Sequence, residues 1–249
     1  MSEKIDIIIS EFKKAGISVS EMQAKMFYEY YDMLIETNKV MNLTAITEFD
    51  DVIFKHFIDS VLINNIESIK EEINSKKNIS IIDVGTGAGF PGIPLKILYP
   101  DINITLLDSL NKRITFLESV IERLNLKNVK CIHGRAEDFG NDKKYREKYD
   151  FCVSRAVANL STLTEYCIPF VKVKGKFISY KASNVDEEIN EAKNAIKLLS
   201  ANISDVNKMI IKDNTGTEYE RNFVIIEKVK PLKKQYPRKS GIPSRKPLQ

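Results

Sequence analysis

The stretch IIDVGTGAGFPG, residues 81–92, decides the fold of this chain. It opens with apolar residues typical of a buried strand, passes through Gly85, Gly87 and Gly89, and leads into a segment of helical character. Glycine lets a backbone approach a ligand closely, and the start of a helix exposes amides that can bind one. The order of strand, glycine loop and helix therefore predicts a nucleotide-binding loop.

The spacing around the glycines favours one class of nucleotide. A dinucleotide-binding fingerprint needs its third glycine at position 90, where this chain has Phe90. The pattern is instead D-x-G-x-G-x-G, with Asp83 at the end of the strand, and the next strand ends at Asp108. A carboxylate in that second position can accept both hydroxyls of a ribose. These residues together predict a site for S-adenosylmethionine (SAM), with the loop and Phe90 along the cofactor and the ribose at Asp108.

The third predicted strand is followed by RAED, residues 135–138. The pair Ala136 and Glu137 is placed to frame an adenine through backbone and side-chain contacts. Glu137 and Asp138 could equally be acids at the start of a helix. For the loop itself, a strand–helix turn without a ligand and a nicotinamide cofactor remain the alternatives.

Short apolar strands alternate with helical segments from residue 79 onward, which predicts parallel βαβ units in a doubly wound α/β sheet. The last two strands have no helix between them and are expected to form an antiparallel hairpin at the sheet edge. The predicted strands are Ile79–Val84, Ile102–Asp108, Val129–His133, Phe151–Ser154, Lys176–Lys181, Val206–Lys212 and Asn222–Val229. The predicted helices are Pro91–Leu98, Asn111–Leu124, Leu160–Val171 and Val185–Ser200.

The first 70 residues have helical periodicity instead. Gly16 suits the end of a short first helix, and Ser20 with Gln23 forms the capping-box start of the next. A further helix is expected over Glu48–Ile69. The predicted organisation is a helical extension (1–70), a SAM-binding core (71–230) and a basic tail (231–249).

His56 and Asp59 lie on the last of these N-terminal helices at i and i+3, so they share one face of it. They could steady a substrate or pair with each other. A packing role for the histidine is the alternative, and the sequence does not assign the two residues separate roles.

The composition excludes several classes of protein. Of the 249 residues, 43% are hydrophobic and 29% are charged, which is typical of a globular chain and too apolar for a disordered one. The three cysteines contain no CxxC pair, so we expect a reducing compartment, no disulfide framework and no metal site. No apolar run is long enough for a membrane span or a signal peptide, so we expect a soluble, cytoplasmic chain with no membrane partner.

Positive charge is concentrated at the end of the chain. The net charge is +4, yet the segment 228–249 holds eight basic side chains and no acid. This asymmetry suggests a polyanion partner, a solvated terminus being the alternative. We expect the prolines to keep the tail extended, so that its cations can meet nucleic-acid phosphates. The alternative is that the tail folds back and closes the sheet edge, with its charges facing solvent. The candidate residues for nucleic-acid contact are Arg135, Arg238, Lys239, Arg245 and Lys246.

The end of the fourth strand, YDFCVSRAVANL at 149–160, bears on the methyl acceptor. Methyltransferases acting on exocyclic amino groups of bases usually carry [DN]PP[YF] here, whereas this chain has Ser154–Ala156. Methylation of a pyrimidine carbon needs a cysteine nucleophile, but Cys152 and Cys167 lie inside a predicted strand and helix, where packing is the expected role. What remains is an acceptor with its own lone pair, such as a ring nitrogen, which needs in-line placement and no general base.

Arg155 stands at the end of this fourth strand, where a doubly wound sheet places its site. We expect it to organise the cofactor pocket or the incoming base. It is not expected to move a proton, because a guanidinium stays charged. A purely structural salt bridge is the alternative.

The chain as a whole resembles the glucose-inhibited division protein B family, the small-subunit ribosomal RNA methyltransferases G. The glycine loop alone would indicate only the SAM superfamily, but the matching stretches run along the full length. Lys55 stands where the family more often has arginine. The stretches that carry the resemblance are MNLTAIT (41–47), KHFIDS (55–60), DVGTGAGFPGIPL (83–95), LLDSLNKR (106–113), RAED (135–138), SRAVA (154–158) and YPRKSGIPSRKPL (236–248).

The resemblance implies a class I SAM-dependent methyltransferase: a Rossmann-like, mostly parallel seven-stranded sheet with an antiparallel edge hairpin and a helical N-terminal extension. It also implies methyl transfer from SAM to nitrogen 7 of a guanine (position 527 in the conventional numbering) in the decoding-region loop of 16S rRNA. The RNA could be naked or in a small-subunit assembly intermediate, and no obligate protein partner is inferred. The alternatives are a methyltransferase for a small molecule, which the basic tail argues against, and a non-catalytic RNA-binding assembly protein.

Overall fold

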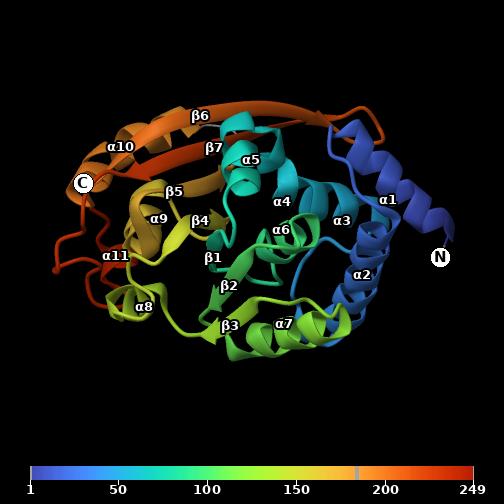
Figure 1. Ribbon diagram of the computed structural model, residues 1–249, viewed down its shortest axis with the longest axis horizontal. Helices are drawn as coiled ribbons and strands as arrows, with labels where there is room; N and C mark the ends of the chain where they lie inside the picture. The colour runs from blue at the N-terminus through green and yellow to red at the C-terminus, as the bar shows by residue number, and fades with distance from the viewer. Residues whose placement is uncertain (1, 183–184, 249) are drawn as a thin grey trace.

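Seven strands form a single sheet in the computed structural model, which describes residues 2–182 and 185–248 (Figure 1). They are β1 (Ser80–Val84), β2 (Asn103–Asp108), β3 (Val129–His133), β4 (Tyr149–Arg155), β5 (Val171–Lys181), β6 (Ala201–Lys212) and β7 (Glu218–Lys228). Their spatial order is β3-β2-β1-β4-β5-β7-β6. The first five are parallel neighbours, and β7 is antiparallel to both β5 and β6. The predicted doubly wound α/β sheet with an antiparallel edge hairpin is confirmed.

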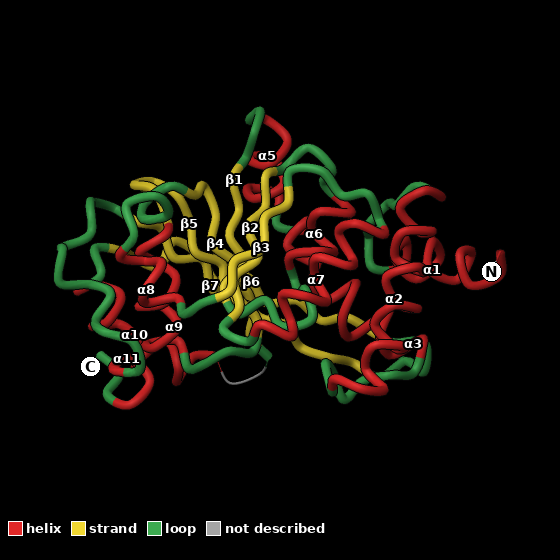
Figure 2. Tube along the Cα trace, turned by 90° about the horizontal axis from the view of Figure 1, so that it is seen from below, coloured by secondary structure: helices red, strands yellow, loops and turns green. Residues whose placement is uncertain are grey.

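Helices cover both faces of this sheet, as Figure 2 shows. On one face lie α1 (Ser2–Lys14), α2 (Glu21–Met41), α6 (Gly92–Leu98) and α7 (Asn111–Arg123). On the other lie α8 (Ala136–Asn141), α9 (Leu160–Cys167) and α10 (Val185–Leu198). Each face has its own apolar core, so β1 is buried on both sides, with Ile81 in one core and Ile82 in the other. This two-sided burial explains why the strands read as nearly continuous apolar runs.

The helix expected over Glu48–Ile69 is interrupted, so the prediction of one continuous helix is wrong. The segment contains α3 (Phe49–Val52), a π-helical turn η1 (Ile53–Ile58), α4 (Asp59–Val61), a 3-10 turn η2 (Leu62–Asn65) and α5 (Glu67–Ser75). Side chains of the sheet bind its main-chain carbonyls: Arg155 donates to the Lys55 oxygen, and the Tyr180 hydroxyl donates to the Ser60 oxygen. These contacts accompany the departure from regular α-helical geometry, and such departures are frequent at functional sites.

Other elements differ from the expectation mainly at their ends. The helix expected over Leu160–Val171 stops at Cys167, because Pro169 follows in a 3-10 turn, η3 (Ile168–Phe170). Strand β5 consequently begins earlier than the sequence indicates, and the two hairpin strands are longer. Helix α8 follows β3 directly, and its first turn contains the acidic pair of the RAED stretch. The capping box at Ser20 is confirmed.

The N-terminal helices share one apolar core with the glycine loop. Tyr30 of α2 is fully buried, and its hydroxyl donates a hydrogen bond to the main-chain oxygen of Ala88. Its ring packs against Phe57, Phe90 and Phe116, which come from three other parts of the chain. The helical extension therefore supports the loop directly.

The last segment of the chain is folded, so the expectation of an extended tail is wrong. Leu232 and Tyr236 are buried in the second core. The Arg146 guanidinium donates hydrogen bonds to the main-chain oxygens of Leu232, Lys233 and Tyr236. The tail then makes one helical turn, α11 (Ile242–Arg245), and lies beside α8 and α9 in Figure 1. It is part of the packed structure on that face of the sheet.

Removing the buried hydroxyl in Tyr30→Phe should destabilise the protein, because the Ala88 carbonyl loses its partner. We expect the free energy of unfolding, measured by urea denaturation, to fall by about 1–3 kcal/mol. Tyr31→Phe is the matched control, since the Tyr31 hydroxyl makes only an exposed contact of 3.4 Å with the Thr47 oxygen. It should change stability by less than about 0.5 kcal/mol. Equal effects of the two changes would contradict the role given to Tyr30.

Candidate functional site

Asp83, at the end of β1, binds the glycine loop from the buried side. One of its carboxylate oxygens accepts hydrogen bonds from the Thr86 hydroxyl (2.6 Å) and the Gly92 amide (2.8 Å). The side chain is fully buried, and burial raises the pKa of Asp83 to about 7. The sequence indicates a cofactor contact for Asp83, whereas the structure places it behind the loop, where it joins the start of the loop to the start of α6.

A cavity of about 200 Å³ lies at the carboxyl ends of β1, β2 and β3. Since these strands are parallel neighbours, the residues that follow them meet at one edge of the sheet. Val157 and Tyr166, which the sequence analysis does not single out, also line the cavity. The predicted site residues in its lining are Gly85, Asp108, Arg135, Ala136 and Glu137.

Two further predicted residues, Gly87 and Phe90, are outside the described lining of this cavity. Gly87 has a φ of +62°, and the space where its side chain would stand is open. A ligand can therefore approach its backbone, which only glycine allows without strain. Phe90 is buried and stacks on the His56 ring, with the ring centroids 4.5 Å apart.

Asp108 connects the loop to the second strand. One oxygen of its carboxylate accepts a hydrogen bond from the Gly87 amide (2.9 Å) and another from Arg113 Nη1 (3.2 Å). The other oxygen accepts from the Leu110 amide (2.9 Å) at the start of α7. A carboxylate has about four lone-pair sites, so Asp108 is oriented by the protein and retains acceptor capacity toward a ligand.

A second cavity, of about 410 Å³, borders the chain segment that follows β4. Arg155 and Ala156 line this cavity, while the next residue, Val157, lines the first one. The end of β4 therefore lies between two spaces of different chemistry. The polar side chains that line the first are Asp108, Ser109, Arg135, Glu137 and Tyr166. Those that line the second are Lys55, His56, Asp59, Arg155, Tyr180, Lys181 and Arg221.

Asp59 is the centre of the charged network in the second cavity. It is buried, and its carboxylate accepts hydrogen bonds from Arg155 Nη1 (2.6 Å) and from Arg221 Nε. Arg155 also donates to the Lys55 main-chain oxygen (3.0 Å), and its guanidinium carbon lies 5.2 Å from the centroid of the Phe90 ring. Two guanidinium groups share one carboxylate, so the cluster of three is net positive where it borders the cavity.

His56 contacts the same arginine. Its Nδ1 lies 3.3 Å from Arg155 Nη2, and its Nε2 lies 2.8 Å from the Thr44 hydroxyl oxygen. Burial, with the neighbouring Arg155 charge, lowers the pKa of His56 to about 4. The two residues that the sequence places on one helix face, His56 and Asp59, thus both contact Arg155, and the imidazole is neutral at pH 7.

The sequence analysis does not single out Arg221 or Lys181. Arg221 comes from β7, and the antiparallel register that pairs Asn222 with Lys181 brings it beside the end of β4. Neither residue lies in a motif with a recognisable spacing. The position of Arg221 in the site follows from strand pairing alone.

The cysteines, the possible metal ligands and the helices of residues 2–182 and 185–248 can be compared with the predictions from the sequence. Cys152 and Cys167 are fully buried, and burial raises the pKa of the Cys152 thiol, in agreement with the predicted packing role. Within the same residues, no three His, Cys, Asp or Glu side chains gather as a metal site would require. None of the helices described is both long and apolar enough to span a bilayer.

The basic residues of the tail differ in their surroundings. Arg238 is paired with Glu165, a fully buried carboxylate, through Nη2 (2.6 Å) and Nε (3.0 Å). Lys239, Arg245 and Lys246 are exposed. Arg238 therefore anchors the tail to α9, and the other three cations face solvent.

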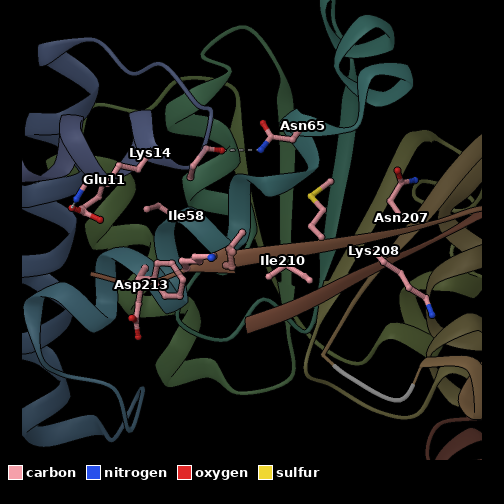
Figure 3. A pocket seen from close by; sticks show the side chains of 13 residues that line it. Glu11, Lys14, Ile58, Asn65, Asn207, Lys208, Ile210 and Asp213 are labelled. Carbon is pink, nitrogen blue, oxygen red and sulfur yellow. Dashed lines mark hydrogen bonds and ion pairs between the residues drawn. The ribbon is translucent and has the colours of Figure 1, made fainter. Parts of the chain in front are cut away.

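A larger cavity, of about 740 Å³, lies elsewhere in the molecule (Figure 3). Figure 3 shows Glu11 and Lys14 of α1 on one side of it and Asn207 and Lys208 of β6 on the other. Its lining comes from α1, η1, Asn65 and the edge strand, with no contribution among the described residues from the carboxyl ends of the parallel strands. Size alone therefore does not identify the functional site.

The doubly wound sheet, the glycine loop after β1 and the carboxylate at the end of β2 define a class I SAM-dependent methyltransferase. Its fold is similar to the crystal structure of M. jannaschii TYW2 in complex with AdoMet, with a TM-score of 0.50 and 18% identity over 67% of this chain and 76% of that one. This likeness concerns the fold alone.

Sequence comparison identifies the family. Residues 23–217 match the family model described as rRNA small subunit methyltransferase G. The chain is 49% identical over 237 residues to the Ribosomal RNA small subunit methyltransferase G of Desulforamulus reducens, covering 95% of each chain. It is 48% identical over 246 residues to the protein of that name from Clostridium botulinum, covering 99% of each. The chain belongs to the rRNA small subunit methyltransferase G family.

Stability should depend on pH through His56. Its pKa is about 4 in the folded chain against a reference value of 6.5, so the unfolded chain binds the proton more tightly. The stability that depends on a neutral His56 is fully present above pH 6.5 and is lost as the pH falls toward 4. Between pH 7 and pH 4.5 we expect the wild type to lose about 2 kcal/mol relative to His56→Gln, measured by urea denaturation. Asp83 titrates in both proteins, so its contribution cancels. A difference that does not vary with pH would contradict a buried neutral imidazole.

Proposed function

We propose that this protein transfers a methyl group from SAM to nitrogen 7 of a guanine (position 527 in the conventional numbering) in 16S rRNA. The observation that carries the proposal is the pair of cavities that meet at the end of β4. One has the residues that suit an adenosine, and the other has a neutral imidazole and paired arginines. Membership of the rRNA small subunit methyltransferase G family supports RNA as the substrate.

The residues around the first cavity fit SAM. A Cβ atom on Gly85 would lie 2.5 Å from Val157 Cγ2, so the loop backbone and this wall already stand as close as they can. The cavity is below the usual range for ligand pockets of about 300–1,000 Å³, so it suits the adenosine part, with the rest along the open space at Gly87. Asp108 would accept the ribose hydroxyls, and Ala136 and Glu137 would frame the adenine. When bound, SAM supplies an electrophilic methyl group on a positively charged sulfur.

The second cavity suits an acceptor that has no proton to lose. Guanine N7 has a lone pair in the plane of the ring, so its methylation needs placement and no general base. Asp59 is the carboxylate in the described lining, and both of its oxygens are engaged by Arg155 and Arg221. Arginine is the side chain that most often binds the O6 and N7 edge of guanine. In this site the arginines would orient the base through O6, which leaves N7 free to attack.

Arg155 has a positioning role in this proposal. Its guanidinium is held by Asp59, by the Lys55 carbonyl and by the Phe90 ring, so its direction is set before a ligand arrives. It stands at the border between the two cavities, where the methyl group would pass from one to the other. Preorganised charge of this kind lowers the cost of reorientation during the reaction.

Exposed cations near the first cavity support an RNA substrate. Arg135 lines the cavity and is exposed, and Lys239, Arg245 and Lys246 are exposed on the tail that packs beside α8 and α9. Such residues suit phosphate contacts that orient an RNA without reading its sequence. Because Arg238 is paired with Glu165, we assign it a smaller share of this binding. A cytoplasmic location follows from the proposed substrate.

The proposal is tested by labelling. The protein is incubated with tritiated SAM and 16S rRNA from a strain that lacks the gene, either naked or in small subunits, and the labelled nucleoside is identified after digestion. We expect 7-methylguanosine at one position. Label in a small molecule but in no rRNA would favour a metabolite methyltransferase. SAM binding without incorporation into any RNA would favour a non-catalytic assembly protein.

Asp108→Asn should weaken SAM binding at least about tenfold, because an amide replaces the charged acceptor of the ribose hydroxyls. Calorimetry measures the affinity, and thermal unfolding reports any loss of stability from the Gly87, Leu110 and Arg113 contacts. Asp101→Asn, at an exposed turn before β2, is the control and should change neither quantity. If Asp108→Asn lowered stability but left the SAM affinity unchanged, the carboxylate would serve only the loop and α7.

A further inference from the structure

Glu137, in the wall of the first cavity, is held by the C-terminal tail. Its side chain is buried, with 4% of its surface exposed. Its Oε1 accepts a hydrogen bond from the main-chain amide of Gly241, at 2.8 Å. The sequence assigns these two residues to separate functions, one to the cofactor and one to a stretch of RNA-binding tail. The fold places them in direct contact.

The same part of the tail also holds the helix that carries Glu137. Helix α8 has only six residues, too few for a helix to be stable alone. The Ser240 hydroxyl donates to an oxygen of Asp138 (2.6 Å), and Asn141 Nδ2 donates to the Pro237 main-chain oxygen (3.2 Å). The helix is therefore fixed to the tail along its length, from its first turn to its last residue.

The tail is itself anchored to the cavity by α9. Arg238 is bound to the buried Glu165 of α9 through its side chain and its main-chain amide (2.8 Å). The Thr162 hydroxyl, also on α9, donates to the Pro243 main-chain oxygen (3.2 Å). Helix α9 further contributes Tyr166 to the cavity lining. The segment between these two anchors is thus fixed at both ends.

We propose that the stretch Ser240–Lys246, which contains the second of these anchors, is a structural part of the cofactor site, in which the Gly241 amide positions Glu137 toward the adenine. We call it the closing segment. The proposal rests on the proposed function in taking SAM as the ligand of the first cavity. The cofactor affinity then depends on a stretch of chain that follows the whole parallel sheet and contributes no residue to the described cavity lining.

The inner and outer sides of the closing segment have separate roles in this proposal. Its main chain and Ser240 face α8, whereas Arg245 and Lys246 are exposed. The exposed cations belong to the proposed RNA contact, and the inner groups belong to the cofactor cavity. Measuring SAM affinity without RNA isolates the inner role.

The test is a chain that ends at Lys239. It lacks the closing segment and the three residues that follow it but keeps the Arg238–Glu165 pair and the buried Leu232 and Tyr236. We expect calorimetry without RNA to show SAM binding about tenfold weaker than in the intact chain. Lys233→Ala with Lys234→Ala, two exposed side chains earlier in the same tail, is the charge control and should leave the affinity unchanged.

Glu137→Gln in both chains separates positioning from general stabilisation. If the closing segment acts through Glu137, this change should weaken SAM binding in the intact chain and add little in the shortened one. If the losses of SAM affinity caused by Glu137→Gln and by shortening the chain were fully additive, the proposal would be overturned. Wild-type affinity in a folded, shortened chain would overturn it too. An intact chain that does not bind SAM would instead overturn the proposed function.

If the shortened chain does not fold, hydrogen exchange in the intact chain tests the proposal instead. The Gly241 amide should exchange at least about tenfold faster in Glu137→Ala than in the wild type, and SAM should slow its exchange in the wild type. Exchange that is unaffected by both the substitution and SAM would overturn the proposal.

Discussion

The arrangement at the carboxyl ends of the parallel strands depends on one buried carboxylate. Asp83 accepts hydrogen bonds from the Thr86 hydroxyl and the Gly92 amide, so the end of β1, the glycine loop and the start of α6 share a single anchor. Ionising a carboxyl group in an apolar interior is costly, and donors aimed at it reduce the cost. Because the loop is fixed to β1, the backbone of Gly87 stays within hydrogen-bond distance of Asp108 on the next strand. The anchor thus sets the position of Asp108, the proposed ribose acceptor, relative to the loop.

The N-terminal helices also support the glycine loop. Tyr30 of α2 bonds the Ala88 carbonyl, and the π-helical turn η1 places His56 against Phe90, directly after the glycines. The N-terminal helices therefore form one wall of the site as well as a cover for the sheet. Asp59, which follows the same turn, brings its charge to Arg155 at the end of β4. A single stretch of irregular helix connects the cofactor loop with the second cavity.

The charges of the second cavity favour positioning over proton transfer. Asp59 is engaged by two guanidinium groups, and His56 is neutral because burial and Arg155 disfavour its protonation. These groups can orient a base and steady it during in-line attack. The tail positions side chains beside the first cavity in the same way: Arg238 pairs with Glu165, and the Gly241 amide donates to Glu137. Both cavities are thus bordered by side chains whose directions are set by partners within the chain.

The sequence by itself determined the sheet, the glycine loop and the acid at the end of β2, because each depends on a local pattern. Alternating strands and helices specify a parallel sheet, and glycines specify a tight turn. Because neighbouring parallel strands end at the same edge of a sheet, Gly85 and Asp108 meet there independently of how the other elements pack. The tertiary structure alone decided the remainder. Asp83 lies behind the loop, Arg221 reaches the site through antiparallel pairing, and the tail folds against Glu137 instead of extending. Such contacts join residues far apart in the chain, and they depend on strand register and packing, which local periodicity does not encode.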